Sequence, residues 1–120
     1  MNPQPSNSFL GVEMREDVLI ARFTRQMILS GDAAEAVAER LGSLLSEPGP
    51  KRLLIDFGNV ESLTSFMLGR LIMLNRAAEA GGRRLALFNL SPEVRQILEV
   101  ARLNLFLALY DDESAALRGC

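Results

Sequence analysis

Three hydroxyl side chains that lie close together, Ser62, Thr64 and Ser65, are the residues of this chain best placed to carry chemistry. They follow a short apolar run that ends near Asp56, and an apolar stretch with helical spacing begins at Ser65. The unpaired backbone N–H groups and the dipole at a helix N-terminus favour negative charge. A phosphate on Ser65 or Thr64 would be stabilised there, and it would add a charge of about −1.5 to −2.

Helix capping is the alternative explanation for these hydroxyls. Ser, Thr and Asn are common at helix starts because their side chains accept hydrogen bonds from the first free N–H groups. The sequence pattern alone does not separate a cap from a phosphoacceptor. We interpret Asp56 as a carboxylate that fixes the loop after its strand, because the acidic pair and the lysine that a phosphoaspartate site requires are missing from the neighbouring strand ends.

The composition excludes most kinds of catalytic site. Histidine is absent and the single cysteine is the last residue, Cys120. One chain therefore cannot build a Ser–His–Asp triad, a Cys–His pair or a zinc site of His and Cys. We expect a protein that is not an enzyme and that needs no metal and no cofactor. The net charge of −2 predicts no basic surface for nucleic acid or for an anionic membrane.

The length and the apolar segments predict one cytoplasmic domain. No run approaches the ~20 apolar residues that span a bilayer, and residues 1–8 lack the basic and apolar regions of a signal peptide. A lone terminal cysteine gives no disulfide framework, which fits a reducing compartment. We expect residues 1–8, rich in Pro, Asn and Ser, to be a disordered lead-in, and residues 9–120 to form a single domain.

Hydrophobic patterning predicts an α/β fold. The apolar runs at 9–14 and 18–23, joined by a polar turn, are typical of an antiparallel hairpin at a sheet edge. The runs at 52–57 and 84–89 lack polar alternation, as expected of strands buried on both faces of a parallel sheet. The other predicted elements are helices at about 32–46, 65–80, 92–101 and 112–117 and a short strand at 106–110. Together they predict a mostly parallel mixed sheet of about five strands with four helices.

Local signals mark where these elements begin and end. Asp32 and Glu35 have the spacing of a capping box at the start of the first helix. Residues 58–63, between a buried strand and the next helix, are predicted to be a loop. Gly81-Gly82 is expected to end the second helix, and Ser91-Pro92-Glu93 to start the third with a capping hydroxyl and a proline in the first turn.

The helix that begins at Ser65 carries two sets of apolar residues. The set that suffices to cover a sheet comprises Met67, Leu68, Leu71, Ile72 and Leu74. A second set, Phe66, Met73 and Ala77, lies on roughly one stripe with Arg70. This stripe predicts a surface for a partner. The alternative is that Phe66 folds back into the core and that Met73 packs under a neighbouring helix.

The chain resembles a STAS domain, the domain shared by bacterial anti-sigma factor antagonists and the cytoplasmic tails of sulfate transporters. The residues that carry the resemblance are Gly81-Gly82, the strand that ends at Asn89, Ser91-Pro92-Glu93-Val94, the spacing of Leu98, Leu103 and Phe106, and Ala115-Ala116-Leu117. The resemblance extends over nearly everything from Phe9 onward and implies a STAS-like fold. Because no transmembrane segment precedes it, we expect the stand-alone antagonist branch.

The resemblance implies partner switching. In the family, the unphosphorylated domain binds an anti-sigma factor that is also a serine kinase, phosphorylation at the start of the second helix breaks the complex, and a phosphatase restores it. The family motif Asp-Ser-Ser/Thr-Gly-Leu-Gly aligns with residues 63–68, so the phosphoacceptor maps to Ser65, with Thr64 as the hydroxyl before it. Leu63 stands in place of the aspartate, and Phe66 and Leu68 stand in place of the glycines.

We predict a partner-binding surface around the mapped phosphoacceptor. Its candidate residues are Ser30, Gly31, Asp32, Ser62, Phe66, Met67, Arg70 and Met73. The expected partners are an anti-sigma factor kinase and a phosphatase, and neither nucleic acid nor a membrane. The alternative function is a constitutive scaffold or homo-oligomer subunit that uses Phe66, Arg70 and Met73 in a self-contact. A nucleotide or another small ligand at the same helix ends is a further alternative.

Overall fold

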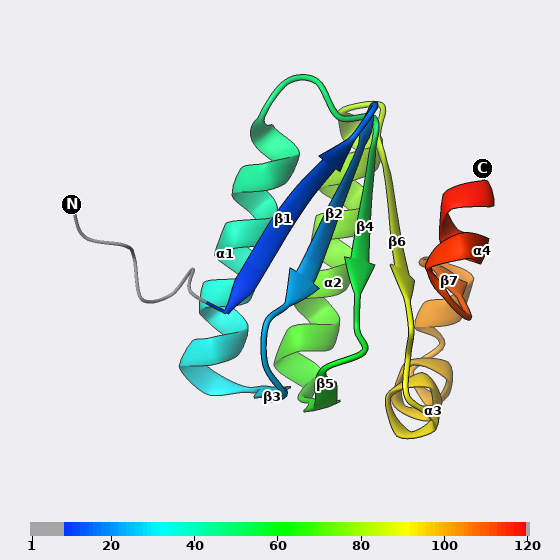
Figure 1. The fold of residues 1–120 in the computed structure, drawn as a ribbon. Helices are drawn as coiled ribbons and strands as arrows, with labels where there is room; N and C mark the ends of the chain where they lie inside the picture. The colour runs from blue at the N-terminus through cyan, green and yellow to red at the C-terminus, as the bar shows by residue number, and fades with distance from the viewer. Residues whose placement is uncertain (1–8, 120) are drawn as a thin grey trace.

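An antiparallel hairpin opens the described part of the chain, residues 9–119, in this computed structural model (Figure 1). Strands β1 (Leu10–Arg15) and β2 (Val18–Phe23) pair along their full length, and the backbone turns at Glu16, where φ is 56°. The hairpin lies at one edge of the sheet, which confirms its prediction from the sequence. The lead-in expected for residues 1–8 lies outside the described residues.

Strand β4 (Arg52–Asp56) lies in the centre of a five-stranded sheet whose order is β1-β2-β4-β6-β7. It pairs in parallel with β2 on one side and with β6 (Arg84–Phe88) on the other, and β7 (Ala108–Tyr110) adds a parallel edge strand. Residues 53–55 are at most 2% exposed, because side chains cover both faces of the sheet. The prediction of a mostly parallel mixed sheet is confirmed.

Helices α1 (Gly31–Ser46) and α2 (Ser65–Ala80) cover one face of the sheet, and α4 (Glu113–Arg118) lies on the other (Figure 1). The larger core lies under α1 and α2 and takes in apolar side chains of α3 (Pro92–Val100). The smaller core, under α4, consists of Val18, Ile20, Leu54, Ala86, Phe88 and Ala116. The predicted four helices are thus present, and in such a sheet the strand C-termini form the edge where loops enter helices.

The predicted limits of α2 and the predicted start of α3 are confirmed. Helix α2 ends before Gly81-Gly82, and Gly82 adopts the left-handed φ of 73° that glycine accepts without strain. At the start of α3, the Oγ of Ser91 accepts a hydrogen bond of 3.1 Å from the backbone N–H of Val94.

Two local predictions are wrong. The segment predicted to be a loop contains β5 (Val60–Leu63), which pairs in parallel with β3 (Met27–Leu29) in a separate two-stranded sheet. The predicted capping box of Asp32 and Glu35 is absent, because the N-cap of α1 is Ser30, two residues before Asp32, and both acidic residues lie within the helix. Strands β3 and β5 are too short to show an alternating pattern in the sequence, and each is a strand only because it pairs with the other.

The last strand is shorter than predicted. Residues 103–105 form a 3₁₀ turn, and the backbone N–H of Leu107 donates to the carbonyl of Leu103 at 2.8 Å, so strand pairing begins only at Ala108. Within residues 9–119, no helix has the length and apolar character to cross a membrane.

Candidate functional site

The small β3–β5 sheet brings two helix starts together. Leu29 lies opposite Leu63 in its parallel register. Helix α1 begins at Gly31, soon after β3 ends, and α2 begins at Ser65, soon after β5 ends. We call the two adjoining segments the paired helix starts; they are Ser30–Asp32 and Ser62–Ser65. The two groups of candidate residues that the sequence placed far apart in the chain are thus neighbours in space.

The N-caps of the paired helix starts make no side-chain capping bond. Ser30 and Thr64 are both extended, and neither side chain accepts a hydrogen bond from the first turn of its helix. The Oγ1 of Thr64 instead donates to the carbonyl of Leu29 at 3.4 Å. Ser91 and Asp112, the N-caps of α3 and α4, do make capping bonds. Capping therefore does not explain Ser30 or Thr64, and their helix starts have no capping side chain for the first-turn N–H groups.

Ser65 is the first residue of α2 and is exposed, as are Thr64, Gly31 and Asp32. The first turn of α2 contains no acidic residue. The hydroxyl of Ser65 is thus open to solvent at the positive end of a sixteen-residue helix. This is the position that the sequence predicts for it; modification of the hydroxyl remains a prediction.

The stripe of Phe66, Arg70 and Met73 lies on the surface. Phe66 is 45% exposed and Met73 is 58% exposed, so the alternative in which Phe66 folds back into the core and Met73 packs under a neighbouring helix is wrong. The guanidinium of Arg70 lies over the ring of Phe66, 5.2 Å from its centroid, and approaches the carboxylate of Glu35 in α1 at 3.7 Å. The stripe is therefore a preformed apolar surface with a cation held over its ring.

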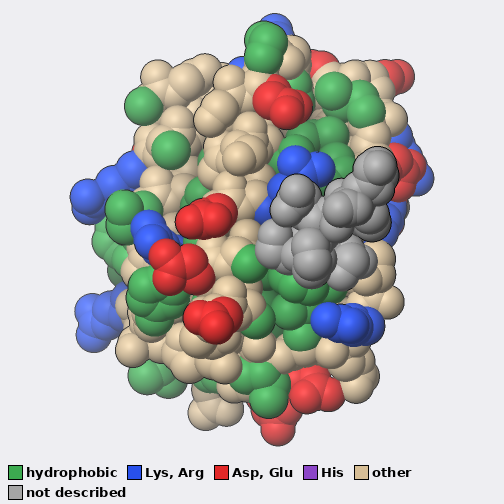
Figure 2. Space-filling model, turned by 90° about the vertical axis from the view of Figure 1, so that its left-hand side faces the viewer, with side chains coloured by type: hydrophobic (Ala, Val, Ile, Leu, Met, Phe, Trp, Pro, Cys, Tyr) green, Lys and Arg blue, Asp and Glu red, His purple; other side chains and the backbone are tan. Residues whose placement is uncertain are grey.

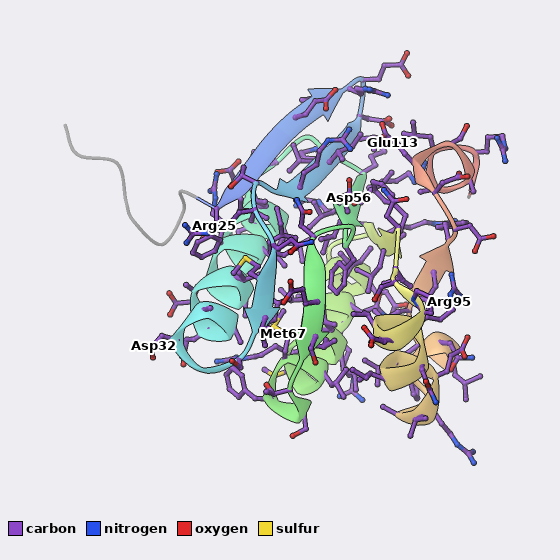
Figure 3. All side chains as sticks on the ribbon, turned by 60° about the horizontal axis from the view of Figure 1, so that its bottom comes forward. Arg25, Asp32, Asp56, Met67, Arg95 and Glu113 are labelled. Atoms are coloured by element: carbon purple, nitrogen blue, oxygen red, sulfur yellow. The ribbon has the colours of Figure 1, made fainter. Side chains whose placement is uncertain are left out.

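Met67 requires a correction as a candidate partner-binding residue. Its side chain is 0% exposed and belongs to the larger core (Figure 3). The position after Phe66 is rotated by about 100° around the helix, which turns Met67 toward the sheet while Phe66 faces water. Each of the other candidate residues is either half-buried or exposed, so none of them lies in the core.

Asp56 fixes the loop after the central strand, as predicted. Its Oδ1 accepts hydrogen bonds from the backbone N–H of Gly58 at 2.8 Å and from the Nδ2 of Asn89 at 3.1 Å. Its Oδ2 accepts from the guanidinium of Arg22 at 3.2 Å. All of these partners are structural, and they hold the chain where it leaves β4 for β5.

A charged cluster that the sequence did not predict joins α4 to the sheet. Arg22 also donates to Glu113 at 2.9 Å, and Asp56 and Glu113 reach this region from β4 and α4 (Figure 3). The hydrogen bond from Arg22 holds the pKa of the Glu113 carboxyl below its usual range. Arg15 and Arg22 likewise lower the pKa of Glu13. These residues come from four elements, so no local spacing in the sequence could reveal the cluster.

A groove of about 760 Å³ was also missed. It lies between α3 and the segment formed by β5 and the start of α2, and Ser62 of the paired helix starts lines it together with Ile28, Leu68 and Ile97. Ile97 is partly buried, and the docking of α3 across from β5 turns the exposed part of that helix into a groove wall.

The face formed by α1 and β1 carries side chains of mixed type. Figure 2 shows hydrophobic side chains there in several separate areas, interspersed with acidic and basic side chains. On this face no single hydrophobic area dominates among the described residues.

The chain matches a known domain family. The family model described as "Mlab, STAS domain" matches residues 26–109, which is more than half of the chain and includes both paired helix starts. No curated protein sequence matches.

Solved structures of three proteins illustrate the fold. An anti-sigma factor antagonist from Mycobacterium paratuberculosis is 21% identical, with a TM-score of 0.80, and the match covers 96% of this chain and 95% of that one. The Bacillus cell fate determinant SpoIIAA in its phosphorylated form is 20% identical, with a TM-score of 0.67 and coverage of 91% and 97%. A sulfate transporter family protein from Wolinella succinogenes is 19% identical, with a TM-score of 0.70 and coverage of 88% and 86%. At these identities the similarity establishes the fold.

Proposed function

Because this chain belongs to the STAS domain family, we propose that it is a non-enzymatic regulatory protein of the anti-sigma factor antagonist type. It binds an anti-sigma factor that is also a serine kinase, and phosphorylation of Ser65 breaks the complex. A phosphatase then returns the protein to its binding form.

The observation that carries this proposal is the position of Ser65. Its hydroxyl is exposed at the first residue of α2, beside the start of α1, and the N-caps of both helices leave the first turns without a capping side chain. A kinase can reach such a hydroxyl. The phosphate formed there would accept hydrogen bonds from free backbone N–H groups, so the modified domain would remain folded.

The departures from the family motif are compatible with this chemistry. Leu63, in place of the family's aspartate, is 6% exposed and packs in the larger core. It brings no carboxylate to the start of α2, so it does not oppose a second negative charge. Phe66, in place of a glycine, extends the apolar surface next to Ser65 and would serve as an anchor for the partner.

A phosphate on Ser65 would act on the partner by electrostatics. The surface around Ser65 suits a complex with the unphosphorylated protein. Phe66 and Met73 supply apolar area, and Arg70, the cation of the stripe, is already paired with Glu35. An added charge of about −2 would have to be desolvated in that interface. Like or unpaired charges at an interface cost several kcal/mol.

Intact-mass measurement tests the proposal. The protein is incubated with ATP and the histidine-kinase-like ATPase encoded nearest to its gene, and one added phosphate is expected on the wild type and on Thr64→Ala but not on Ser65→Ala. Binding of the kinase to Ser65→Glu should be lost. The absence of added phosphate, together with unchanged binding by Ser65→Glu, would contradict the switch.

A constitutive homo-oligomer is the second candidate function, and the exposure of Phe66 and Met73 favours it. In this case the stripe pairs with the same stripe of a second copy. Sedimentation velocity over a range of concentrations should then show a dimer that Phe66→Asp abolishes. A monomer at every concentration would contradict it.

A further inference from the structure

The groove between α3 and the start of α2 has walls of exposed aliphatic side chains. Ile28, at the β3 wall, is 51% exposed, and Val100, near the end of α3, is 76% exposed. Leu68, Ile97 and Ala101 supply the rest of its apolar lining. Large aliphatic side chains that meet in an open concave surface, instead of lying singly over a molecule, are typical of an interaction site.

Two carboxylates flank this apolar lining. Glu61 comes from β5 and Glu93 from the first turn of α3, so the two charges lie on different walls. Both are exposed, and neither forms an ion pair with any residue between 9 and 119. The described residues that line the groove include no Lys and no Arg. The groove thus combines an apolar lining with two carboxylates that form no ion pair within residues 9–119.

We propose that this groove binds an amphipathic helical segment of a partner protein, one that carries apolar side chains on one face and Lys or Arg beside them. The apolar face would cover Ile28, Leu68 and Val100, and the cations would pair with Glu61 and Glu93. Helix α3 has nine residues, so the wall is about 13 Å long, which accommodates two to three turns of a bound helix. The apolar lining and the two carboxylates are present in the unphosphorylated protein.

Charge argues against the other occupants. An anionic small molecule, such as a nucleotide or a fatty acid, would meet two carboxylates and no cation. A second copy that docked groove against groove would bring the carboxylates of Glu61 and Glu93 from both copies together with no cation between them, and like charges at an interface are unfavourable.

Peptide titration of the full-length protein tests this proposal. The probe is a fluorescently labelled amphipathic helical peptide with leucines at i, i+3, i+4 and i+7 and lysines beside them, and the matched peptide has glutamates in place of the lysines. The lysine peptide should bind and the glutamate peptide should bind at least about tenfold more weakly. Salt should weaken the binding, because Glu61 and Glu93 are exposed.

Variants of exposed residues locate the binding in the groove. Val100→Asp should weaken the lysine peptide about tenfold, whereas Leu105→Asp, which changes a side chain that is 70% exposed outside the groove, should leave it within about twofold. Glu61→Lys should weaken the lysine peptide and strengthen the glutamate peptide. Ser65→Ala should bind as the wild type does, so a failure of the phosphorylation switch leaves this result intact.

Three results would overturn the proposal. The first is no binding of the lysine peptide at ~1 mM, the weakest affinity that such a titration resolves. The second is equal loss of binding in Val100→Asp and Leu105→Asp. The third is self-association of the protein that Val100→Asp abolishes, which would assign the groove to a second copy of the chain.

Discussion

The backbone N–H of Thr64 donates to the carbonyl of Leu29 at 3.2 Å, which ties the N-cap of α2 to the last residue of β3. Through this bond the starts of α1 and α2 are fixed next to each other, although more than thirty residues of sequence separate them. Two positive helix ends that face the same region repel each other weakly, and an anion placed between them would relieve that repulsion. Phosphorylation of the exposed hydroxyl of Ser65 would supply such an anion.

Thr64→Ala should cost little stability, because Thr64 makes no capping bond and its hydroxyl forms only a long hydrogen bond of 3.4 Å to the carbonyl of Leu29. We expect the free energy of unfolding to fall by less than about 0.5 kcal/mol. The matched control is Ser91→Ala, which removes a real capping bond and should cost about 1 kcal/mol. Urea unfolding of both variants gives the comparison, and equal losses would mean that the hydroxyl of Thr64 stabilises the start of α2 as strongly as a capping bond does.

Ser65→Glu should separate stability from binding. A carboxylate in the first turn of α2 interacts favourably with the helix dipole, so the variant should be more stable than the wild type by about 0.3–1 kcal/mol. Its binding to the kinase partner should nevertheless be lost, as measured by titration calorimetry. Ser43→Glu, which places the same charge on an exposed position late in α1, is the control and should bind normally. A destabilised Ser65→Glu would show that the start of α2 does not accept an anion.

Long patterns in the sequence were sufficient for the main architecture. Helix α2 extends over sixteen residues from the serine at which it was predicted to begin, and β4 and β6 have the unbroken apolar runs of strands covered on both faces. Such elements carry enough residues for periodicity to stand out from composition. The position of Ser65 at the start of α2 could be predicted for the same reason.

Features that depend on pairing between distant segments could not be predicted. Strands β3 and β5 have three and four residues, and each is a strand only because the other lies beside it. The two apolar sets on α2 differ in burial because the sheet and α1 cover some sides of the helix and not others, and the spacing within the helix does not show which sides a neighbour covers. The groove beside α3 has the same origin.

Stability should depend on pH through Glu113. Arg22 holds the pKa of this carboxyl below its usual range in the folded protein, so its contribution to stability is present above the pKa of the unfolded chain, about 4.3. The contribution is lost as the pH falls below that value toward the folded pKa. Urea unfolding of the wild type and of Glu113→Gln should therefore give a difference at pH 7 that narrows at about pH 3. A difference that stays constant over this range would show that the ion pair does not stabilise α4.

Truncation of two methionines of α2 should have different effects: one truncation should lower stability, and the other should weaken partner binding. Met67 is 0% exposed in the larger core, whereas Met73 is 58% exposed on the stripe with Phe66. Met67→Ala should lower the free energy of unfolding by about 2–5 kcal/mol, because it leaves a cavity under the helix. Met73→Ala should change it by less than about 0.5 kcal/mol, yet it should weaken the binding of a partner that covers the stripe. Urea unfolding and a binding titration measured on the same two proteins distinguish the roles, and comparable destabilisation by both would place Met73 in the core after all.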